Sequence, residues 1–240
     1  MKIMKVKNAD FDRAAAQYIV RAVLKKPDAV LCLATGDTTR KIFDEIVRLK
    51  QELDIDFSGV HVLNLDEYVG VSPDDPASCQ WRIVDHLHSR LGLRKDQYYV
   101  PTAEDMDGER ACEDFRRVLD ELGGVDLLLL SVGQNGHIAF NEPGTSFGLG
   151  IHLAPISDST KEAKKELFGG KDKVPELGIS VGIADVMNMR EILFAAKGPH
   201  KADIVEKALR GPVTEDVPAS VLQLHPNLCV ILDEDAAAKL

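Results

Sequence analysis

The stretch VDLLLLSVG, residues 125–133, places four consecutive leucines between an aspartate and a glycine-bounded turn. An apolar run of this length is typical of a strand that is covered on both faces, as in a parallel sheet. Further apolar strands are predicted within AVLCLAT (29–35), GVHVLNLDEYVG (59–70), REILFAAKG (190–198) and NLCVILDED (227–235). Amphipathic segments predict helices over about 9–25, 40–52, 79–92 and 108–124, with another after Gly198. This alternation predicts an α/β fold, a mostly parallel central sheet flanked by helices on both faces in a Rossmann-like three-layer sandwich.

Length and composition favour one globular domain over residues 1–240. The chain is 45% hydrophobic and has no internal repeat or low-complexity stretch. Its 39 acidic and 29 basic side chains give a formal net charge of −10, which repels polyanions, so we expect no nucleic-acid partner. An anionic substrate would therefore need a local basic pocket.

The chain also lacks signs of a membrane or metal protein. Its longest apolar run is far below the roughly 20 residues that span a bilayer, so we expect no membrane association. Cys32, Cys79, Cys112 and Cys229 are widely spaced and form no CxxC pair. This usage is typical of reduced thiols in a cytoplasmic protein, and it predicts neither a disulfide framework nor a metal site.

In a parallel α/β sheet the ligand lies beyond the carboxyl ends of the strands. The first such loop, in LATGDTTR (33–40), carries Gly36, Asp37, Thr38 and Thr39 at the start of a helix. Backbone N–H groups and hydroxyls at a helix N-terminus favour an anion such as phosphate. The alternative is a plain helix cap with a glycine turn, and the Asp37 carboxylate would repel a phosphate.

Two further loops carry groups suited to proton transfer. Asp66 and Glu67 directly follow an apolar strand, where a carboxylate withdrawn from water can act as a base. The alternative is that these side chains cap a helix or turn at the end of the strand. In SVGQNGHIAFNEPGTS (131–146), Asn135, His137 and Glu142 follow the most apolar strand. A histidine is the usual general base near neutral pH, and the carboxylate five residues later can hold its ring in one tautomer. The alternative is that both side chains lie in an exposed loop without a catalytic role.

Two basic clusters remain. In AAKGPHKAD, Lys197, His200 and Lys201 lie near a helix start, where a cation beside free N–H donors suits a phosphate. The segment STKEAKKELF (159–168) carries three lysines, which we interpret as a solvated helix face.

Three motifs, LNLDEYVG (63–70), GQNGHIAFNEPGTS (133–146) and PASVLQLHPN (218–227), resemble the glucosamine-6-phosphate deaminase (isomerase) family over nearly the whole chain. The GHIAFNEP segment is the most specific part, since the related 6-phosphogluconolactonases share the GH dipeptide without FNEP. The resemblance implies conversion of glucosamine 6-phosphate and water to fructose 6-phosphate and ammonium, without a cofactor or metal. The expected partner is thus a small-molecule amino-sugar phosphate.

The resemblance also implies roles for individual residues. His137 would be the ring-opening base held by Glu142, and Asp66 would move the proton between C2 and C1. Asn135 stands where the best-known family pattern has Asp, and it would orient by hydrogen bonds. The Thr38 loop and Lys201 match phosphate-binding positions, and Lys161 stands where an arginine commonly contacts phosphate.

Two departures from the family pattern bear on substrate affinity and regulation. The first loop has Asp37 where a small residue is usual and Thr39 where proline is usual. The stretch FGLGIHLAPI (147–156) lacks the basic residues through which regulated hexameric members bind an N-acetylated effector, and the sequence ends at Leu240 without their longer tail. We therefore expect no such activation, and a monomer or small homo-oligomer.

Three alternatives stay open at this point. KPDAVLCLATG (26–36) and PASVLQLHPN look at least as much like galactosamine-6-phosphate deaminases, which act on the C4 epimer. A 6-phosphogluconolactonase is disfavoured by FNEP and by LDEY. A non-enzymatic sugar-phosphate sensor predicts a DNA-binding extension and loss of the acid and base, whereas Asp66 and His137 are present.

Overall fold

The computed structural model of the chain describes residues 1–104 and 107–240. Within these residues a seven-stranded sheet has the order β1-β10-β9-β6-β2-β3-β5, and all of its neighbouring strands are parallel. Its strands are β1 (Lys2–Val6), β2 (Val30–Leu33), β3 (His61–Asn64), β5 (Tyr98–Tyr99), β6 (Leu127–Leu130), β9 (Ile192–Ala196) and β10 (Leu228–Asp233). The predicted parallel sheet is confirmed.

A second, antiparallel sheet, with the order β4-β8-β7, was not predicted. It consists of β4 (Asp66–Tyr68), β7 (His152–Pro155) and β8 (Leu177–Ser180). The expected strand in residues 59–70 therefore divides between two sheets. The chain leaves the large sheet after Asn64, whose side-chain amide donates to the carbonyl of Asp66 at 2.8 Å, and Val181 N donates to Leu65 O at 2.9 Å.

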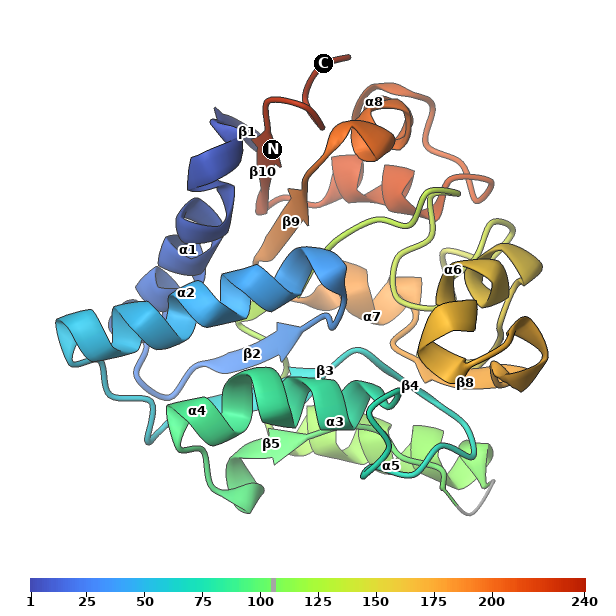
Figure 1. Cartoon of the computed structure of the whole chain (residues 1–240), viewed down its shortest axis with the longest axis horizontal. Helices are drawn as coiled ribbons and strands as arrows, with labels where there is room; N and C mark the ends of the chain where they lie inside the picture. Colours follow the sequence, from blue (N-terminus) through green and yellow to red (C-terminus); the bar gives the residue numbers. More distant parts are fainter. Residues whose placement is uncertain (105–106) are drawn as a thin grey trace.

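Helices cover both faces of the large sheet (Figure 1). They are α1 (Phe11–Lys25), α2 (Asp37–Leu53), α3 (Cys79–Ile83), α4 (Ser89–Leu91), α5 (Gly108–Glu121), α6 (Asp158–Phe168), α7 (Ile183–Asn188) and α8 (Ala202–Arg210). A π-helical turn over Val84–His88 joins α3 to α4, so the predicted helix over 79–92 is one continuous helical segment. Short 3₁₀ turns span Asn8–Asp10, Lys95–Gln97, Lys171–Lys173, Pro199–Lys201 and Pro218–Leu224.

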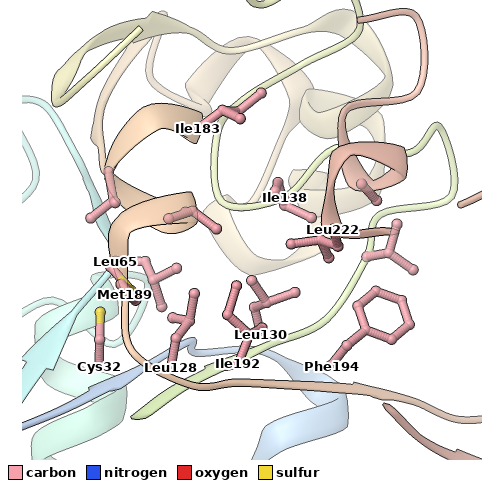
Figure 2. Close-up of a cluster of buried hydrophobic side chains, with 14 of the residues drawn as sticks. Cys32, Leu65, Leu128, Leu130, Ile138, Ile183, Met189, Ile192, Phe194 and Leu222 are labelled. Atoms are coloured by element: carbon pink, nitrogen blue, oxygen red, sulfur yellow. The ribbon is translucent and has the colours of Figure 1, made fainter. Parts of the chain in front are cut away.

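Side-chain alternation along the strands creates two hydrophobic cores, because successive side chains point to opposite faces of a sheet. On β6, Leu127 and Leu129 face α1 and α2, whereas Leu128 and Leu130 face α5, α7 and α8. All four leucines are at most 1% exposed. Figure 2 shows the second core, with strand side chains opposed to residues of α7 and the C-terminal 3₁₀ turn. The unbroken leucine run is thus explained by burial on both faces.

The order of the strands fixes where a ligand can bind. From β2 the chain proceeds to β3 and β5 on one side, and it then returns to β6 on the other side. Loops that leave β2 and β6 therefore diverge at the carboxyl edge, which opens a crevice at this switch point.

Candidate active site

A cavity of about 520 Å³ opens at the switch point between β2 and β6. Its wall combines the loops after β2, β6 and β9 with residues of β4, α3 and α6. Eight of the ten candidate residues from the sequence line it: Gly36, Asp37, Thr38, Thr39, Asp66, Asn135, His137 and Lys201. Glu142 and Lys161 are not part of the lining. The volume is in the range of small-molecule sites.

The loop after β2 forms one end of the cavity. Gly36 precedes the first residue of α2, so residues 37–39 form a first helical turn whose N–H groups lack intrahelical acceptors. Thr39 is buried and its hydroxyl donates to the carbonyl of Gly36 at 3.1 Å, which closes the turn. The Asp37 side chain is exposed at the cavity rim. This end therefore offers backbone donors to an anion, beside one carboxylate.

Two lysines reach the same end of the cavity. The ammonium group of Lys201 donates to the carbonyl of Val132 at 2.7 Å. Burial and the positive charge of Lys164 lower the pKa of Lys201, against the raising effect of Asp37. Lys164 itself lines the cavity, so the interpretation of its cluster as a solvated helix face is wrong for this residue.

The other lysines singled out in the sequence pair elsewhere. The Nζ atom of Lys161 lies 2.5 Å from the Glu176 carboxylate, outside the cavity lining. Lys197 reaches Asp12 of α1 at 2.6 Å. The structure therefore brings Lys164 and Lys201 together, and it does not bring Lys161 to them.

Asp66 and Glu67 have different surroundings although they are adjacent. Side chains alternate along β4, so Asp66 and Tyr68 line the cavity while Glu67 points away and is 1% exposed. Burial and the charge of Glu67 raise the pKa of Asp66 to about 6, against the lowering effects of Arg82, of a hydrogen bond with Cys79 and of His137. Burial thus brings the pKa of the Asp66 carboxyl closer to neutral pH than that of an exposed aspartate.

Glu67 is a structural cap rather than a second acid in the cavity. Its carboxylate accepts hydrogen bonds from Ser78 Oγ at 2.6 Å, from Cys79 N at 3.0 Å and from Gln80 N at 2.8 Å. These donors surround the start of α3. Glu67 therefore fixes α3 to the strand that carries Asp66.

The loop after β6 holds a connected group of three polar side chains. The Glu142 carboxylate accepts from Asn135 Nδ2 and from Thr160 Oγ1, both at 2.6 Å. Its Oε2 atom lies 3.5 Å from Nδ1 of His137, an ion-pair distance longer than a well-formed hydrogen bond. Burial favours a raised pKa for Glu142, but His137, Thr160 and Asn135 lower it to about 2. Glu142 is therefore an ionised orienting group behind the imidazole that lines the cavity.

The absence of a side chain at Gly133 leaves room for the His137 imidazole. A Cβ atom added there would lie 2.2 Å from Cε1 of His137 and 2.4 Å from Nε2. The backbone of Gly133 also closes the loop, because its N–H donates to the carbonyl of His137 at 2.9 Å. Only glycine leaves room for the ring at this position.

Sequence reasoning missed several cavity residues, notably Tyr68, Cys79, Arg82 and Ser159. Tyr68 follows from the alternation of β4 once Asp66 is assigned to the cavity. Arg82 has no comparable indication, since an arginine in an amphipathic segment is usually solvated. No group of three or more histidine, cysteine or acidic side chains that could hold a metal occurs in the part of the chain described, and no helix there is long and apolar enough to cross a membrane.

Comparison with known families gives one match over most of the chain. Residues 7–230 match the family described as glucosamine-6-phosphate isomerases/6-phosphogluconolactonase. A glucosamine-6-phosphate deaminase of Geobacillus sp. (strain WCH70) is 41% identical over 237 residues, covering 98% of this chain and 94% of the relative. One of Lachnoclostridium phytofermentans is 41% identical over 232 residues, covering 95% and 98%.

Solved structures give the same result. A structure described as a monomeric glucosamine-6-phosphate deaminase has a TM-score of 0.96 and 35% identity, with both chains covered completely. The 6-phosphogluconolactonase of Trypanosoma brucei has a TM-score of 0.79 at 19% identity, covering 100% of this chain and 98% of that one. At that identity the likeness concerns the fold alone.

Proposed function

The chain belongs to the family of glucosamine-6-phosphate isomerases and 6-phosphogluconolactonases, and on this premise we propose that it is an enzyme that converts glucosamine 6-phosphate and water into fructose 6-phosphate and ammonium. The names of the relatives at 41% identity favour this substrate over galactosamine 6-phosphate and over a lactone. The observation that carries the proposal is the shared cavity, in which Asp66 and His137 face the same space as Lys164 and Lys201.

The phosphate occupies the end of the cavity formed by the first turn of α2 and the two lysines. Free N–H groups at the N-terminus of a long helix and nearby ammonium groups are the donors that phosphate prefers. Lys201 is held by Val132, and Lys164 provides the second positive charge that the resemblance placed at Lys161. Binding at this end orients the sugar at a distance from the reacting carbons, which contributes to rate through positioning.

His137 opens the sugar ring by moving a proton between the anomeric hydroxyl and the ring oxygen. Glu142 and Asn135 act behind it: the carboxylate favours one ring orientation, and the Asn135 amide holds the carboxylate. The side-chain carbonyl of Asn135 also accepts from the backbone N–H of His137 at 3.2 Å. An asparagine therefore serves this position by hydrogen bonding, without a second negative charge.

Asp66 then takes the proton from C2 of the open-chain aldehyde and delivers it to C1. The electron pair of the C2–H bond passes through an enolamine, and protonation at C1 leaves an iminium group at C2. Water adds to that carbon, and ammonium leaves as the ketone forms. The sequence moves only protons, water and ammonia, so it involves no net oxidation.

The direct test is ammonia release from purified protein supplied with glucosamine 6-phosphate, with fructose 6-phosphate identified as the product. Galactosamine 6-phosphate and 6-phosphogluconolactone are assayed in parallel. We expect turnover of glucosamine 6-phosphate. Turnover of another substrate, with no ammonia release from glucosamine 6-phosphate, would overturn the proposal. Asp66→Asn should abolish ammonia release while binding of fructose 6-phosphate is retained, and unchanged turnover would remove Asp66 as the base.

His137→Gln tests ring opening separately. It should slow the reaction when the ring form must be opened first, and it should leave the later exchange of the C1 proton of fructose 6-phosphate with solvent less affected. Equal loss in both assays would assign His137 to proton transfer at carbon instead.

We infer further that the enzyme acts in the cytoplasm as a monomer or small homo-oligomer. The structural relative with a TM-score of 0.96 is described as monomeric, and the four cysteines are buried and unpaired in this fold. Light scattering coupled to size-exclusion chromatography measures the mass directly, and a hexamer would contradict the inference.

A further inference from the structure

Arg82 is a partly buried cation in the cavity wall that the mechanism above does not use. Its Nη2 atom has two contacts, Thr35 Oγ1 and Cys79 Sγ, both at a long 3.4 Å. Its Nε atom is buried and has no hydrogen-bond partner among residues 1–104 and 107–240. A guanidinium carries five N–H donors, whereas these two contacts of Arg82 use Nη2 alone, and the residue lines the cavity.

The position of Arg82 is fixed relative to Asp66. Glu67 follows Asp66 on β4 and accepts hydrogen bonds from the first turn of α3, the helix that carries Arg82. Ser78 adds a cap, because its hydroxyl accepts from Trp81 N at 3.2 Å. The base and the guanidinium are therefore held on one rigid frame, which is what a positioned site requires.

An arginine whose N–H donors lack acceptors lowers the stability of the fold. Buried charges are normally paired, and a buried donor without an acceptor is unfavourable. No carboxylate forms an ion pair with Arg82 within 4.0 Å in the described part of the chain. A ligand oxygen is the natural acceptor for these donors, since the side chain opens onto the cavity.

The charges around the cavity form two groups. The pKa of Asp66 is shifted by burial, by the charges of Glu67, Arg82 and His137 and by a hydrogen bond with Cys79, whereas the pKa of Lys201 is shifted by burial and by the charges of Lys164 and Asp37. The second group lies at the first turn of α2, where the phosphate is placed. Arg82 lies on α3, which the hydrogen bonds to Glu67 attach to the strand that carries Asp66, so we assign it to the group around the reacting carbons. Its contact with Thr35 also brings it next to the loop that precedes α2.

We propose that Arg82 binds the sugar part of the substrate, donating hydrogen bonds to the oxygens on the carbons that flank C2, and takes no part in holding the phosphate. This assignment rests on the proposed function. It makes Arg82 a substrate-contacting residue that holds the chain against Asp66 and balances the negative charge that spreads onto oxygen when C2 loses its proton.

The test compares two ligands by calorimetry: inorganic phosphate, which probes the phosphate end alone, and fructose 6-phosphate, which probes both ends. Arg82→Met should bind phosphate within twofold of the wild type but fructose 6-phosphate at least tenfold more weakly. Lys201→Met should weaken both ligands. Arg90→Met, in the same helical segment but exposed and paired with Asp44, is the matched control and should change neither.

A second measurement separates contact from scaffolding. Because the positive charge of Arg82 lowers the pKa of Asp66, the acid limb of kcat/KM should move to higher pH in Arg82→Met and stay nearly unchanged in Arg82→Lys. The lysine variant should still bind fructose 6-phosphate more weakly, since it lacks the planar fork. Retained phosphate binding shows that Arg82→Met is folded.

The two proposals fail in different ways. Equal weakening of both ligands in Arg82→Met would place Arg82 at the phosphate, and no change in either would remove it from binding; both outcomes overturn the inference. Wild-type protein that binds fructose 6-phosphate but releases no ammonia from glucosamine 6-phosphate would refute the proposed reaction, while the binding ratio would still decide the role of Arg82.

Discussion

The contact between Gly133 and His137 predicts a large effect from a single methyl group. In Gly133→Ala the added Cβ would lie 2.2–2.5 Å from three atoms of the imidazole. Gly133 is not among the glycines with positive φ, so its backbone accepts alanine without strain. The perturbation is therefore confined to the ring.

The size of the effect follows from these distances. Non-bonded carbon atoms prefer a separation of about 3.5–4.0 Å, so the imidazole must move by more than about 1 Å. A displacement of about 1 Å in a catalytic site can cost about 100-fold in rate, or about 2.7 kcal/mol. We expect kcat/KM for ammonia release to fall by about 100-fold. Overpacking should also cost about 1–3 kcal/mol of unfolding free energy.

The assay is steady-state ammonia release together with the unfolding free energy in urea. Gly148→Ala is the matched control, because the nearest atom to its added Cβ is Ser146 Oγ at 3.9 Å, and it should behave as wild type. In a His137→Ala background the alanine at 133 should cost neither activity nor stability further, since the clashing ring is gone. Activity of Gly133→Ala within threefold of wild type would refute the reasoning.

Four further outcomes follow from the site. Asp37→Asn removes the carboxylate beside the phosphate end and should lower KM by about two- to fivefold at low salt with kcat unchanged, an advantage that must shrink as ionic strength rises; a higher KM would show that Asp37 helps binding. Lys164→Met should raise KM about tenfold and Lys161→Met less than twofold, and the reverse order would restore Lys161 to the phosphate site. The pKa of Glu142 is lowered to about 2, so its ionised form stabilises the fold above the ordinary pKa near 4.3, and this stability is lost as the pH falls toward 2. Between pH 7 and 3 the wild type should therefore lose roughly 1–3 kcal/mol more unfolding free energy than Glu142→Gln. Parallel curves of unfolding free energy against pH for the two proteins would contradict this. N-acetylglucosamine 6-phosphate should not activate the enzyme, and a leftward shift of its substrate-saturation curve would contradict that expectation.

The large sheet could be predicted because its central strands are buried on both faces, and burial leaves an unbroken apolar run such as Leu127–Leu130. The small antiparallel sheet could not be predicted from the sequence. Its strands are short and mixed in polarity, and β4 consists of Asp66, Glu67 and Tyr68, which have no strand pattern of their own. Their pairing depends on β8, more than 100 residues later in the chain, and such a contact has no local signature.

Residues that line the cavity could be predicted where polar side chains cluster in one loop, as for Asn135 and His137. The prediction of the cavity residues was incomplete where a helix presents only one residue in three or four to the cavity. Lys161 and Lys164 differ by nearly one helical turn, yet only Lys164 lines the cavity, whereas Lys161 pairs with Glu176. Arg82 could not be assigned to the cavity from the sequence, since its place in the wall depends on contacts with Thr35 and Cys79 that have no local signature.

The division of the cavity between two sheets has a consequence for which property of the site a substitution affects. The seven-stranded sheet supplies the first turn of α2 and Lys201, whereas the three-stranded sheet supplies Asp66 and, through Glu67, anchors α3. In the proposed reaction, a substitution on the small sheet can therefore alter the base at position 66 while the loops proposed to hold the phosphate, and His137 after β6, stay on the large sheet. Under the proposed function, the affinity for the phosphate and the reaction at C2 therefore depend on different sheets, so a substitution can change one of them and leave the other in place.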